Sequence, residues 1–307
     1  MRYYLGVDGG GSKTTALICD ETGARISSFF AGGINYNAIG IDAARENLRA
    51  AVAGALGGRD IPLSSACIGC AALDGPADDA LTERLCGGVI PCDHIILDSD
   101  VGVALAAMDS EGGAAIAICG TGSMAAGRDR DGRIIHTGGY GYLIGDEGSG
   151  FAVARQAVGA GLRCFDKSGP ATMIKDRLFA FYNAESVPAL LDTLYKTPFT
   201  PGTVAAFAPE VFRCAEEGDA VASSILKDQA KGFAETVKAL LRKLPENAPL
   251  GLWGGMFQHH ESYAALFSEY VKKDFPGCRV GLLPNPPEYG AVLASMRTEN
   301  KNGSCFC

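Results

Sequence analysis

The sequence has no long hydrophobic run and no basic excess. It contains no stretch of about 18 consecutive apolar residues, the length needed to span a membrane, and its N-terminus reaches glycine before any apolar segment of signal-peptide length. The 27 Lys and Arg residues are outnumbered by 35 Asp and Glu residues. The chain therefore lacks the positive field that holds a nucleic-acid backbone or an anionic membrane surface. We expect a cytoplasmic protein that binds neither nucleic acid nor membranes.

Disulfide and metal-binding patterns are also missing. The eleven cysteines are scattered, and their odd number argues against a disulfide scaffold. Cys67 and Cys70 form a CxxC, but they lie in the apolar run SSACIGCAAL and no second pair follows at zinc-site spacing. We interpret them as core thiols. The four histidines lack ligand partners nearby in the sequence, so we assign them no chemistry.

Glycine, by contrast, is abundant, and its first run interrupts a series of β-forming residues. Residues 2–30, RYYLGVDGGGSKTTALICDETGARISSFF, predict three antiparallel strands joined by a glycine turn and a short DETG turn. Apolar residues at helical spacing follow over 41–56, and strand-like segments return at 64–73 and 94–100. Strands that alternate with helices indicate an α/β fold.

The opening arrangement occurs a second time, near residue 114. A shift of 109 positions places Gly11 on Gly120 and the hairpin glycine Gly23 on Gly132. The order of elements is the same in both copies: strand, polar glycine turn, strand, tight turn, strand. This repeat predicts two related domains.

The domain boundaries follow from this repeat. We place the first domain at residues 1–112 and the second at 113–286, with a C-terminal helix over 287–298 rejoining the first. We expect residues 299–307 to form a flexible tail. The second domain is mainly helical after its strands, and its longest helix is predicted from about residue 220 to 244.

The first glycine turn has the composition of a phosphate-binding loop. Gly10 and Gly11 allow backbone N–H groups to approach an anion closely, and Ser12, Lys13 and Thr14 add hydroxyl groups and a cation. The turn differs from the GxxxxGK[ST] loop and from the Rossmann loop because a strand follows it. Such turns are also common structural features, so the second copy strengthens the interpretation.

Carboxylates lie where a nucleotide-dependent reaction would need them. Asp8 ends the first strand beside the glycine turn, where it could hold Mg²⁺ directly or through water, with capping of its own turn as the structural alternative. Asp98 and Asp100 lie at the strand end in HIILDSD, where a carboxylate could accept the proton of an attacking hydroxyl, and Asp100 begins the helix that follows. A helix N-cap is the structural alternative for Asp100.

Four motifs, GVDGGGSKTT, CGTGS, GGYGYLIGDEGSG and WGG, resemble in this order the BadF/BadG/BcrA/BcrD ATPase family and its N-acetylglucosamine kinase relatives. The resemblance spans nearly the whole chain. It implies an α/β protein of the actin, hexokinase and Hsp70 superfamily. Such a protein has two actin-like (ribonuclease H-like) domains of duplicated origin, with ATP and substrate in a cleft between them. It also implies a homodimer, which is common among these relatives.

The resemblance implies a role for each motif in binding Mg-ATP. The first glycine turn becomes the first phosphate loop with Asp8 toward Mg²⁺, CGTGS becomes the second, and the WGG glycines lie near adenosine. Asp100 matches the aspartate of the family's ND-type motif and becomes the general base. The implied ATP-binding residues are Gly10, Gly11, Ser12, Lys13, Thr14, Gly120, Thr121, Gly122, Gly254 and Gly255.

An amino-sugar acceptor is implied too, most readily N-acetylglucosamine at its 6-hydroxyl. The sugar kinases of this group carry GDEGS after a GGWG-like segment, and here that segment is GGYG, with Tyr140 in the place of Trp. Carboxylates, amides and an aromatic face suit a sugar ring. For Asn35, an Asx turn is the structural alternative. The implied acceptor-binding residues are Asn35, Asp100, Gly139, Tyr140, Gly141, Asp146 and Glu147.

Three alternatives stay open. The acceptor could be glucosamine, another hexose derivative or a muramic-type sugar. An ATP-driven iron–sulfur activator of a 2-hydroxyacyl-CoA dehydratase or benzoyl-CoA reductase would share the phosphate loops, but it carries a cluster cysteine in a CAAGTGRF-like run, where this chain has GDEGSGF. A sugar-sensing regulator would need a DNA-binding module, and the first glycine turn begins only a few residues from Met1.

Overall fold

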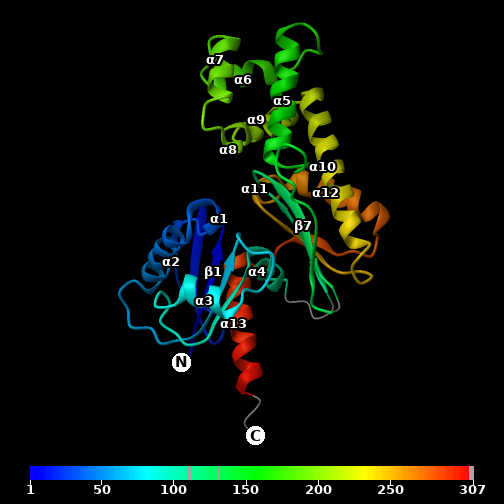
Figure 1. Ribbon diagram of the computed structural model, residues 1–307. Helices are drawn as coiled ribbons and strands as arrows, with labels where there is room; N and C mark the ends of the chain where they lie inside the picture. Colours follow the sequence, from blue (N-terminus) through cyan, green and yellow to red (C-terminus); the bar gives the residue numbers. More distant parts are fainter. Residues whose placement is uncertain (109–112, 130, 304–307) are drawn as a thin grey trace. The chain divides into compact units, whose positions relative to one another are not determined.

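The computed structural model describes residues 1–108, 113–129 and 131–303 (Figure 1). The chain divides into two compact units, one made of Met1–Glu111 with Leu283–Cys307 and the other of Gly112–Leu282. Each unit is built on one five-stranded sheet. Along the described residues, no helix is both long enough and apolar enough to span a membrane.

Unit 1 contains a mixed sheet with helices on both faces. Its strands are β1 (Tyr3–Gly9), β2 (Lys13–Asp20), β3 (Arg25–Gly32), β4 (Leu63–Cys70) and β5 (Ile95–Ser99), in the order β3-β2-β1-β4-β5. Its helices are α1 (Tyr36–Ile39), α2 (Ile41–Leu56), α3 (Asp79–Cys86), α4 (Asp100–Ala106) and α13 (Pro287–Gly303). The predicted meander is confirmed because β1, β2 and β3 pair antiparallel, while β4 and β5 run parallel to β1.

Alternation along β1 assigns each side chain to one face of this sheet. Leu5 is buried in a core cluster with Leu48 of α2, whereas its neighbour Tyr4 packs with Val292 of α13. The face that carries Tyr4 is therefore covered by α13, together with α4, which packs against α13.

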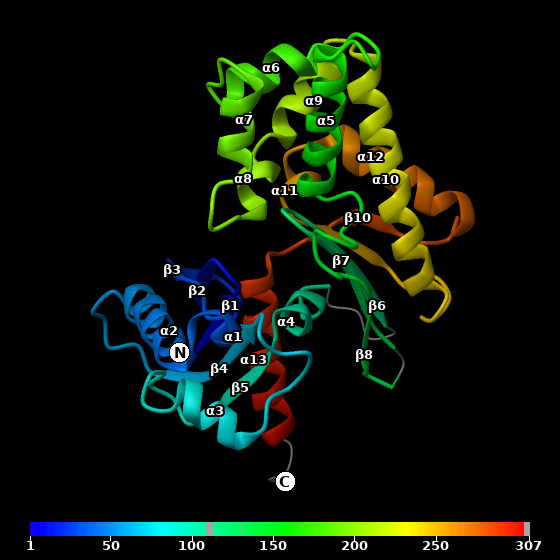
Figure 2. The ribbon, with the colours of Figure 1, turned by 45° about the horizontal axis from the view of Figure 1, so that its top comes forward.

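Unit 2 repeats the same sheet and adds a larger set of helices (Figure 2). Its strands are β6 (Ala114–Cys119), β7 (Ser123–Arg128), β8 (Ile134–Gly138), β9 (Leu250–Trp253) and β10 (Val280–Leu282), in the order β10-β9-β6-β7-β8. Its helices are α5 (Gly150–Phe165), α6 (Ile174–Phe181), α7 (Val187–Leu194), α8 (Pro201–Ala205), α9 (Ala208–Glu216), α10 (Ala220–Leu241), α11 (Gly255–Gln258) and α12 (Glu261–Asp274). The long helix α10 packs on β7 and β8, and α6, α8 and α9 pack with α5.

The predicted duplication is confirmed in strand order and in local detail. Numbered within each unit, both sheets have the order third, second, first, fourth, fifth. Asp20 accepts two backbone N–H groups of its own turn, and Asp129, 109 positions later, does the same. The turn glycines Gly23 and Gly132 have φ of 83° and 81°, which favours glycine at both places.

Some predicted boundaries need correction. The helix α10 ends at Leu241 rather than near residue 244, and α13 continues to Gly303, five residues beyond its predicted end at 298. The remaining tail, 304–307, lies outside the described residues. Cys67 and Cys70 are buried free thiols of β4, as predicted.

Candidate active site

The first glycine turn is a tight loop with an exposed tip. Gly9 of β1 pairs with Thr14 of β2, and the Gly10 N–H donates to the Lys13 carbonyl at 2.9 Å. Gly11, Ser12 and Lys13 are exposed. The chain behind the loop supports it, since the Ile34 N–H donates to the Gly10 carbonyl at 3.1 Å.

Thr14 differs from the rest of this loop because its side chain is fully buried. It pairs with Gly9, so by alternation it lies on the face of Leu5 and α2, opposite to the face of Asp8. Among the buried side-chain nitrogen and oxygen atoms of the described residues, only Thr14 Oγ1 lacks a hydrogen-bond partner. Its hydroxyl is therefore not presented at the exposed tip of the loop.

Asp8 lies at the end of β1, on the face that α13 and α4 cover. On the same face, a Cβ placed at Gly6 would lie 2.1 Å from the carbonyl oxygen of Glu288, so the first turn of α13 is held directly against β1. Burial is the main cause that raises the pKa of Asp8 to about 7; the negative charges of Asp100 and Glu288 also raise it, and Lys13 lowers it. Three carboxylates and one lysine thus share an electrostatic environment beside the first glycine loop.

Asp100 is the first residue of α4, as predicted, but it does not cap that helix. Ser99 is the N-cap, because its Oγ accepts the Gly102 N–H at 3.0 Å. The N-cap alternative for Asp100 is therefore wrong. The Asp100 carboxylate accepts the Val101 N–H at 2.8 Å, and burial raises its pKa.

Glu288 was missed by sequence reasoning, which treated 287–298 only as a closing helix. Burial raises the pKa of Glu288, and the nearby Arg25 and Lys13 lower it. The acidic residue in the first helical turn was visible in the sequence. Nothing in the sequence indicated that this turn would lie beside Asp8.

The second glycine turn joins β6 to β7 and is one residue shorter than the first. Cys119 pairs with Ser123, and the Gly120 N–H donates to the Gly122 carbonyl at 2.9 Å. Two carbonyls of the loop accept N–H groups from the first turn of α5, at 2.8 Å for Gly120 and 3.2 Å for Thr121. The Thr121 side of the loop is exposed.

Residues 139–148, which we call the acceptor segment, follow β8 in unit 2. Tyr140 is 71% exposed, and Glu147 is also exposed. Asp146 is buried and has a φ of 62°, a left-handed conformation for a non-glycine residue. Burial raises the pKa of Asp146, while the nearby backbone N–H groups of Gly141 and Ser123 lower it. A Cβ placed at Gly122 would lie 2.6 Å from Asp146 Oδ2, so the carboxylate is packed against the second glycine loop.

Asn35 makes the Asx turn that was considered as its structural alternative. Its Oδ1 accepts the Asn37 N–H at 3.1 Å and caps the short helix α1. Its Nδ2 donates to the Ala71 carbonyl at 3.4 Å. The side chain is half-buried in unit 1, so these local contacts fix its orientation.

Gly254 and Gly255 lie beside the second glycine loop. Gly254 has a φ of 103°, and a Cβ there would lie 2.3 Å from the carbonyl oxygen of Cys119, which directly precedes the loop. Only glycine fits so close an approach. Gly255 begins α11. The WGG motif therefore lies directly against the strand end that precedes the CGTGS loop.

The described residues contain no group of three or more His, Cys, Asp and Glu side chains arranged to hold a metal ion by themselves. A Mg²⁺ ion that accompanies a nucleotide needs only one or two carboxylates, because phosphates and water complete its shell. The buried, mutually repelling carboxylates of Asp8 and Asp100 fit such an ion, since a cation would relieve the repulsion that raises the pKa of Asp8.

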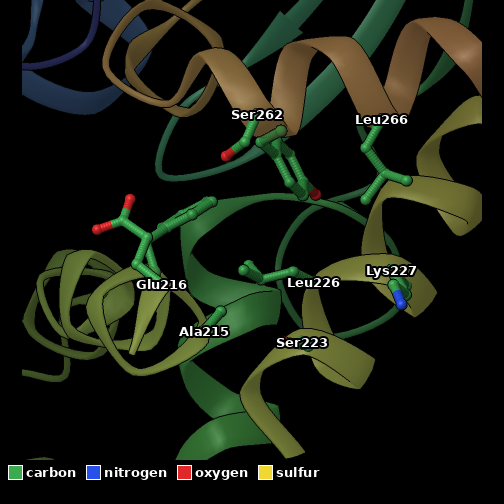
Figure 3. A pocket seen from close by; sticks show the side chains of 9 residues that line it. Ala215, Glu216, Ser223, Leu226, Lys227, Ser262 and Leu266 are labelled. Atoms are coloured by element: carbon green, nitrogen blue, oxygen red, sulfur yellow. The ribbon is translucent and has the colours of Figure 1, made fainter. Parts of the chain in front are cut away.

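A separate pocket of about 280 Å³ lies between α9, α10 and α12 in unit 2 (Figure 3). Its lining is largely apolar, with Glu216 and Lys227 as its charged members. It contains none of the glycine-loop residues. One wall is formed by Tyr263, whose hydroxyl donates to the Gly148 carbonyl of the acceptor segment at 2.8 Å.

Two sheets of identical strand order, each with a glycine loop after its first strand, define an actin-like α/β protein of two domains. The chain belongs to the BadF/BadG/BcrA/BcrD ATPase family, whose model matches residues 5–296. Both the predicted fold class and the predicted family are thereby confirmed.

Named relatives and solved structures agree with this assignment. The chain is 30% identical over 299 residues to an N-acetylmuramic acid/N-acetylglucosamine kinase of Clostridium acetobutylicum, covering 95% of this chain and 98% of the relative. It is 25% identical over 318 residues to an N-acetyl-D-glucosamine kinase of Dictyostelium discoideum, covering 96% and 98%. The fold is similar to that of a putative N-acetylglucosamine kinase from Porphyromonas gingivalis, with a TM-score of 0.77, 23% identity and coverage of 97% and 100%.

Proposed function

We propose that this protein transfers the γ-phosphoryl group of ATP to an amino sugar, with the 6-hydroxyl of N-acetylglucosamine as the favoured acceptor. The observation that carries the proposal is the carboxylate of Asp100, which stands beside Asp8 and the first glycine loop while Ser99 caps the helix. The family supports ATP use. The curated relatives include kinases for N-acetylglucosamine and, in Vibrio cholerae, a kinase for glucosamine. Both of these substrates are amino sugars.

Each glycine loop would offer binding groups to the phosphates of Mg-ATP. The exposed tip at Gly11, Ser12 and Lys13 offers backbone N–H groups and an ammonium group to phosphate oxygens. Thr121 and Gly122 would offer the second loop, and Gly254 and Gly255 would lie near adenosine. Thr14 would support the first loop through its backbone pairing with Gly9.

Asp8 would hold Mg²⁺ directly or through water. When bound, the ion compensates the charge of the phosphate oxygens during transfer. Glu288 and Asp100 add negative charge near the same place. The positive charge of Lys13 offsets part of this negative charge.

Asp100 would accept the proton of the attacking hydroxyl. Burial raises its pKa, which makes the carboxylate a stronger base than an exposed one. The Val101 N–H and the start of α4 hold the side chain at the end of β5. Positioning and charge compensation would supply most of the remaining acceleration, because phosphoryl transfer demands little covalent help from the protein.

Asn35 and Asp100 in unit 1, and the acceptor segment in unit 2, would each offer groups that suit an amino sugar. The exposed Tyr140 ring offers a flat face to the C–H side of a sugar, and the exposed Glu147 carboxylate can accept from its hydroxyls. Asp146, the buried carboxylate of the segment, would also take part in acceptor binding. Gly139 and Gly141 have φ of 73° and 85°, which allows the tight turns that bring Tyr140 to the surface.

A steady-state assay of ADP release tests this proposal. Purified protein with Mg-ATP is given N-acetylglucosamine, N-acetylmuramic acid, glucosamine, N-acetylmannosamine, glucose or no sugar, and phosphorus NMR identifies the phosphorylated hydroxyl. Strong stimulation by one amino sugar supports the kinase and identifies its acceptor. No stimulation by any sugar, with iron in the same preparation, would favour the iron–sulfur activator instead. Light scattering of the same sample tests the proposed homodimer.

A further inference from the structure

We propose that Ser123 and Tyr263 are positioning residues of the acceptor segment, Ser123 holding it to the second glycine loop and Tyr263 holding it to α12, so that acceptor and nucleotide bind with mutual coupling. This inference rests on the proposed function. It concerns hydrogen bonds inside unit 2 only. Ser123 is the last residue of the CGTGS motif, whereas no sequence signal marked Tyr263, which lies 115 positions from its partner Gly148.

The first tie runs from the end of the loop to the segment. Ser123 begins β7 directly after the loop, and its buried hydroxyl donates to the Glu147 carbonyl at 2.7 Å. The backbone N–H of Ser123 also lies near enough to the Asp146 carboxylate to lower its pKa. Ser123 therefore joins the end of the loop to the acceptor segment through its hydroxyl.

The second tie converges on Gly148. Its carbonyl accepts from the hydroxyl of Tyr263 at 2.8 Å and from the thiol of Cys119 at 3.2 Å. Both donors are buried, with 1% and 0% of their surfaces exposed, so water cannot replace either. The Gly148 N–H donates to Gln229 Oε1 at 2.8 Å, which fixes the other side of the same residue.

Hydrogen bonds also connect the second glycine loop to α5. The first turn of α5 donates to both the Gly120 and the Thr121 carbonyls. The residues on either side of the second glycine loop, Cys119 and Ser123, are thus bonded to the segment, and the loop itself is bonded to α5. A shift of the acceptor segment on sugar binding has to move the loop, and a shift of the loop on nucleotide binding has to move the segment.

Such a connection predicts a coupling factor that is the same in both directions. The acceptor should tighten nucleotide binding by the factor by which the nucleotide tightens acceptor binding. Without the Tyr263 hydroxyl, one of the two buried donors to Gly148 is lost, and the segment is held less firmly in the position from which Cys119 and Ser123 connect it to the loop. Each ligand would then still bind alone, but with less mutual enhancement.

The test measures this factor by calorimetry. The Kd of a Mg-bound, non-hydrolysable ATP analogue is determined with and without saturating acceptor, for the natural protein and for Tyr263→Phe and Ser123→Ala. We expect the coupling factor to fall about tenfold, within the usual range of such couplings, while the analogue's Kd without acceptor changes less. In steady state, the KM for ATP at saturating acceptor should rise correspondingly.

Tyr182→Phe is the matched control. It removes a tyrosine hydroxyl that donates to the Thr203 carbonyl at 2.9 Å, in the same unit but outside the acceptor segment. Its coupling factor should equal that of the natural protein. If Tyr263→Phe fails to fold in thermal melts, Ser123→Ala decides.

Different results would contradict the proposed function and the proposed positioning role. If no amino sugar binds or is phosphorylated, the proposed function is wrong. If the acceptor binds and reacts, but Tyr263→Phe and Ser123→Ala couple the two ligands as strongly as Tyr182→Phe does, the positioning role is overturned.

Discussion

The two glycine loops have the same place in duplicated sheets but different surroundings. The first, Gly10–Lys13, has an exposed tip with a lysine and lies beside buried carboxylates. The second, Gly120–Gly122, is bonded to the acceptor segment and to α5, and the end of β6 carries Ile118 and Cys119 in place of a carboxylate.

The hydroxyls at the corresponding starts of β2 and β7 show the same contrast. Thr14 Oγ1 is buried without a partner, whereas Ser123 Oγ donates to Glu147 at 2.7 Å. The duplicated backbone has kept its strand order while the side chains around the two loops differ. Charged groups surround the first loop, and a hydrogen-bonded framework surrounds the second. Variants that act on one loop should therefore differ in kind from variants at the corresponding place of the other.

The largest effect is expected from Asp100→Asn. Turnover should fall by about 10²- to 10⁴-fold, the usual contribution of a general base, while the Kd of the ATP analogue stays close to the natural value. Asp98→Asn is the control, because Asp98 Oδ1 accepts the Ser99 N–H at 2.7 Å at the same strand end and has no proposed catalytic role. Turnover of Asp100→Asn within a few-fold of the Asp98→Asn value would remove Asp100 as the base.

Asp8→Asn should act through the metal. We expect the Mg²⁺ concentration for half-maximal turnover to rise about 10- to 100-fold, the range typical of weakened metal support. Glu288→Gln leaves Asp8 in place and should cause a smaller rise. An equal response of both variants would mean that the carboxylate cluster acts by total charge and that Asp8 has no special place in it.

Asp8→Asn should weaken the use of Mg²⁺, but it should stabilise the folded protein when Mg-ATP is absent. The pKa of Asp8 is raised from 3.8 to about 7 in the folded protein, so the folded state holds a proton that the unfolded chain has lost. The contribution to the free energy of unfolding is present below about pH 3.8 and is lost as the pH rises toward 7. Without Mg-ATP, Asp8→Asn should therefore become more stable than the natural protein between pH 5 and 8, by on the order of 1–4 kcal/mol.

Thermal melts across this pH range measure that difference. Glu288→Gln should reduce the pH dependence only partly, because burial is the main cause of the Asp8 shift. A constant difference between Asp8→Asn and the natural protein from pH 5 to 8 would show that Asp8 titrates normally.

Local sequence signals predicted the helices, strands and turns of both units well. The apolar spacing over 41–56 corresponds to α2 at Ile41–Leu56, and glycine runs marked both loops because tight turns between strands need glycine. The nucleotide side of the candidate site, built around these turns, was accordingly visible in the sequence.

Contacts between residues far apart in the sequence could not be predicted from it. Glu288 reaches Asp8 only because α13 returns to β1, and Tyr263 reaches Gly148 from a helix 115 positions later. Even the choice between Ser99 and Asp100 as N-cap could not be made from the DSD pattern, since both residue types cap helices well.

The smallest effects come from the paired hydroxyls. Thr14→Val replaces an unpartnered buried hydroxyl by a methyl group of similar size, so stability should stay the same or rise slightly. Ser123→Ala leaves the Glu147 carbonyl without its buried donor and should cost about 1–3 kcal/mol in urea unfolding. If Thr14→Val instead lost as much stability as Ser123→Ala, its hydroxyl would have a partner, such as an ordered water, and the two hairpins would be matched in their hydrogen bonds as well as in their strands. A rise in the KM for ATP without loss of stability would instead place the Thr14 hydroxyl in contact with the nucleotide.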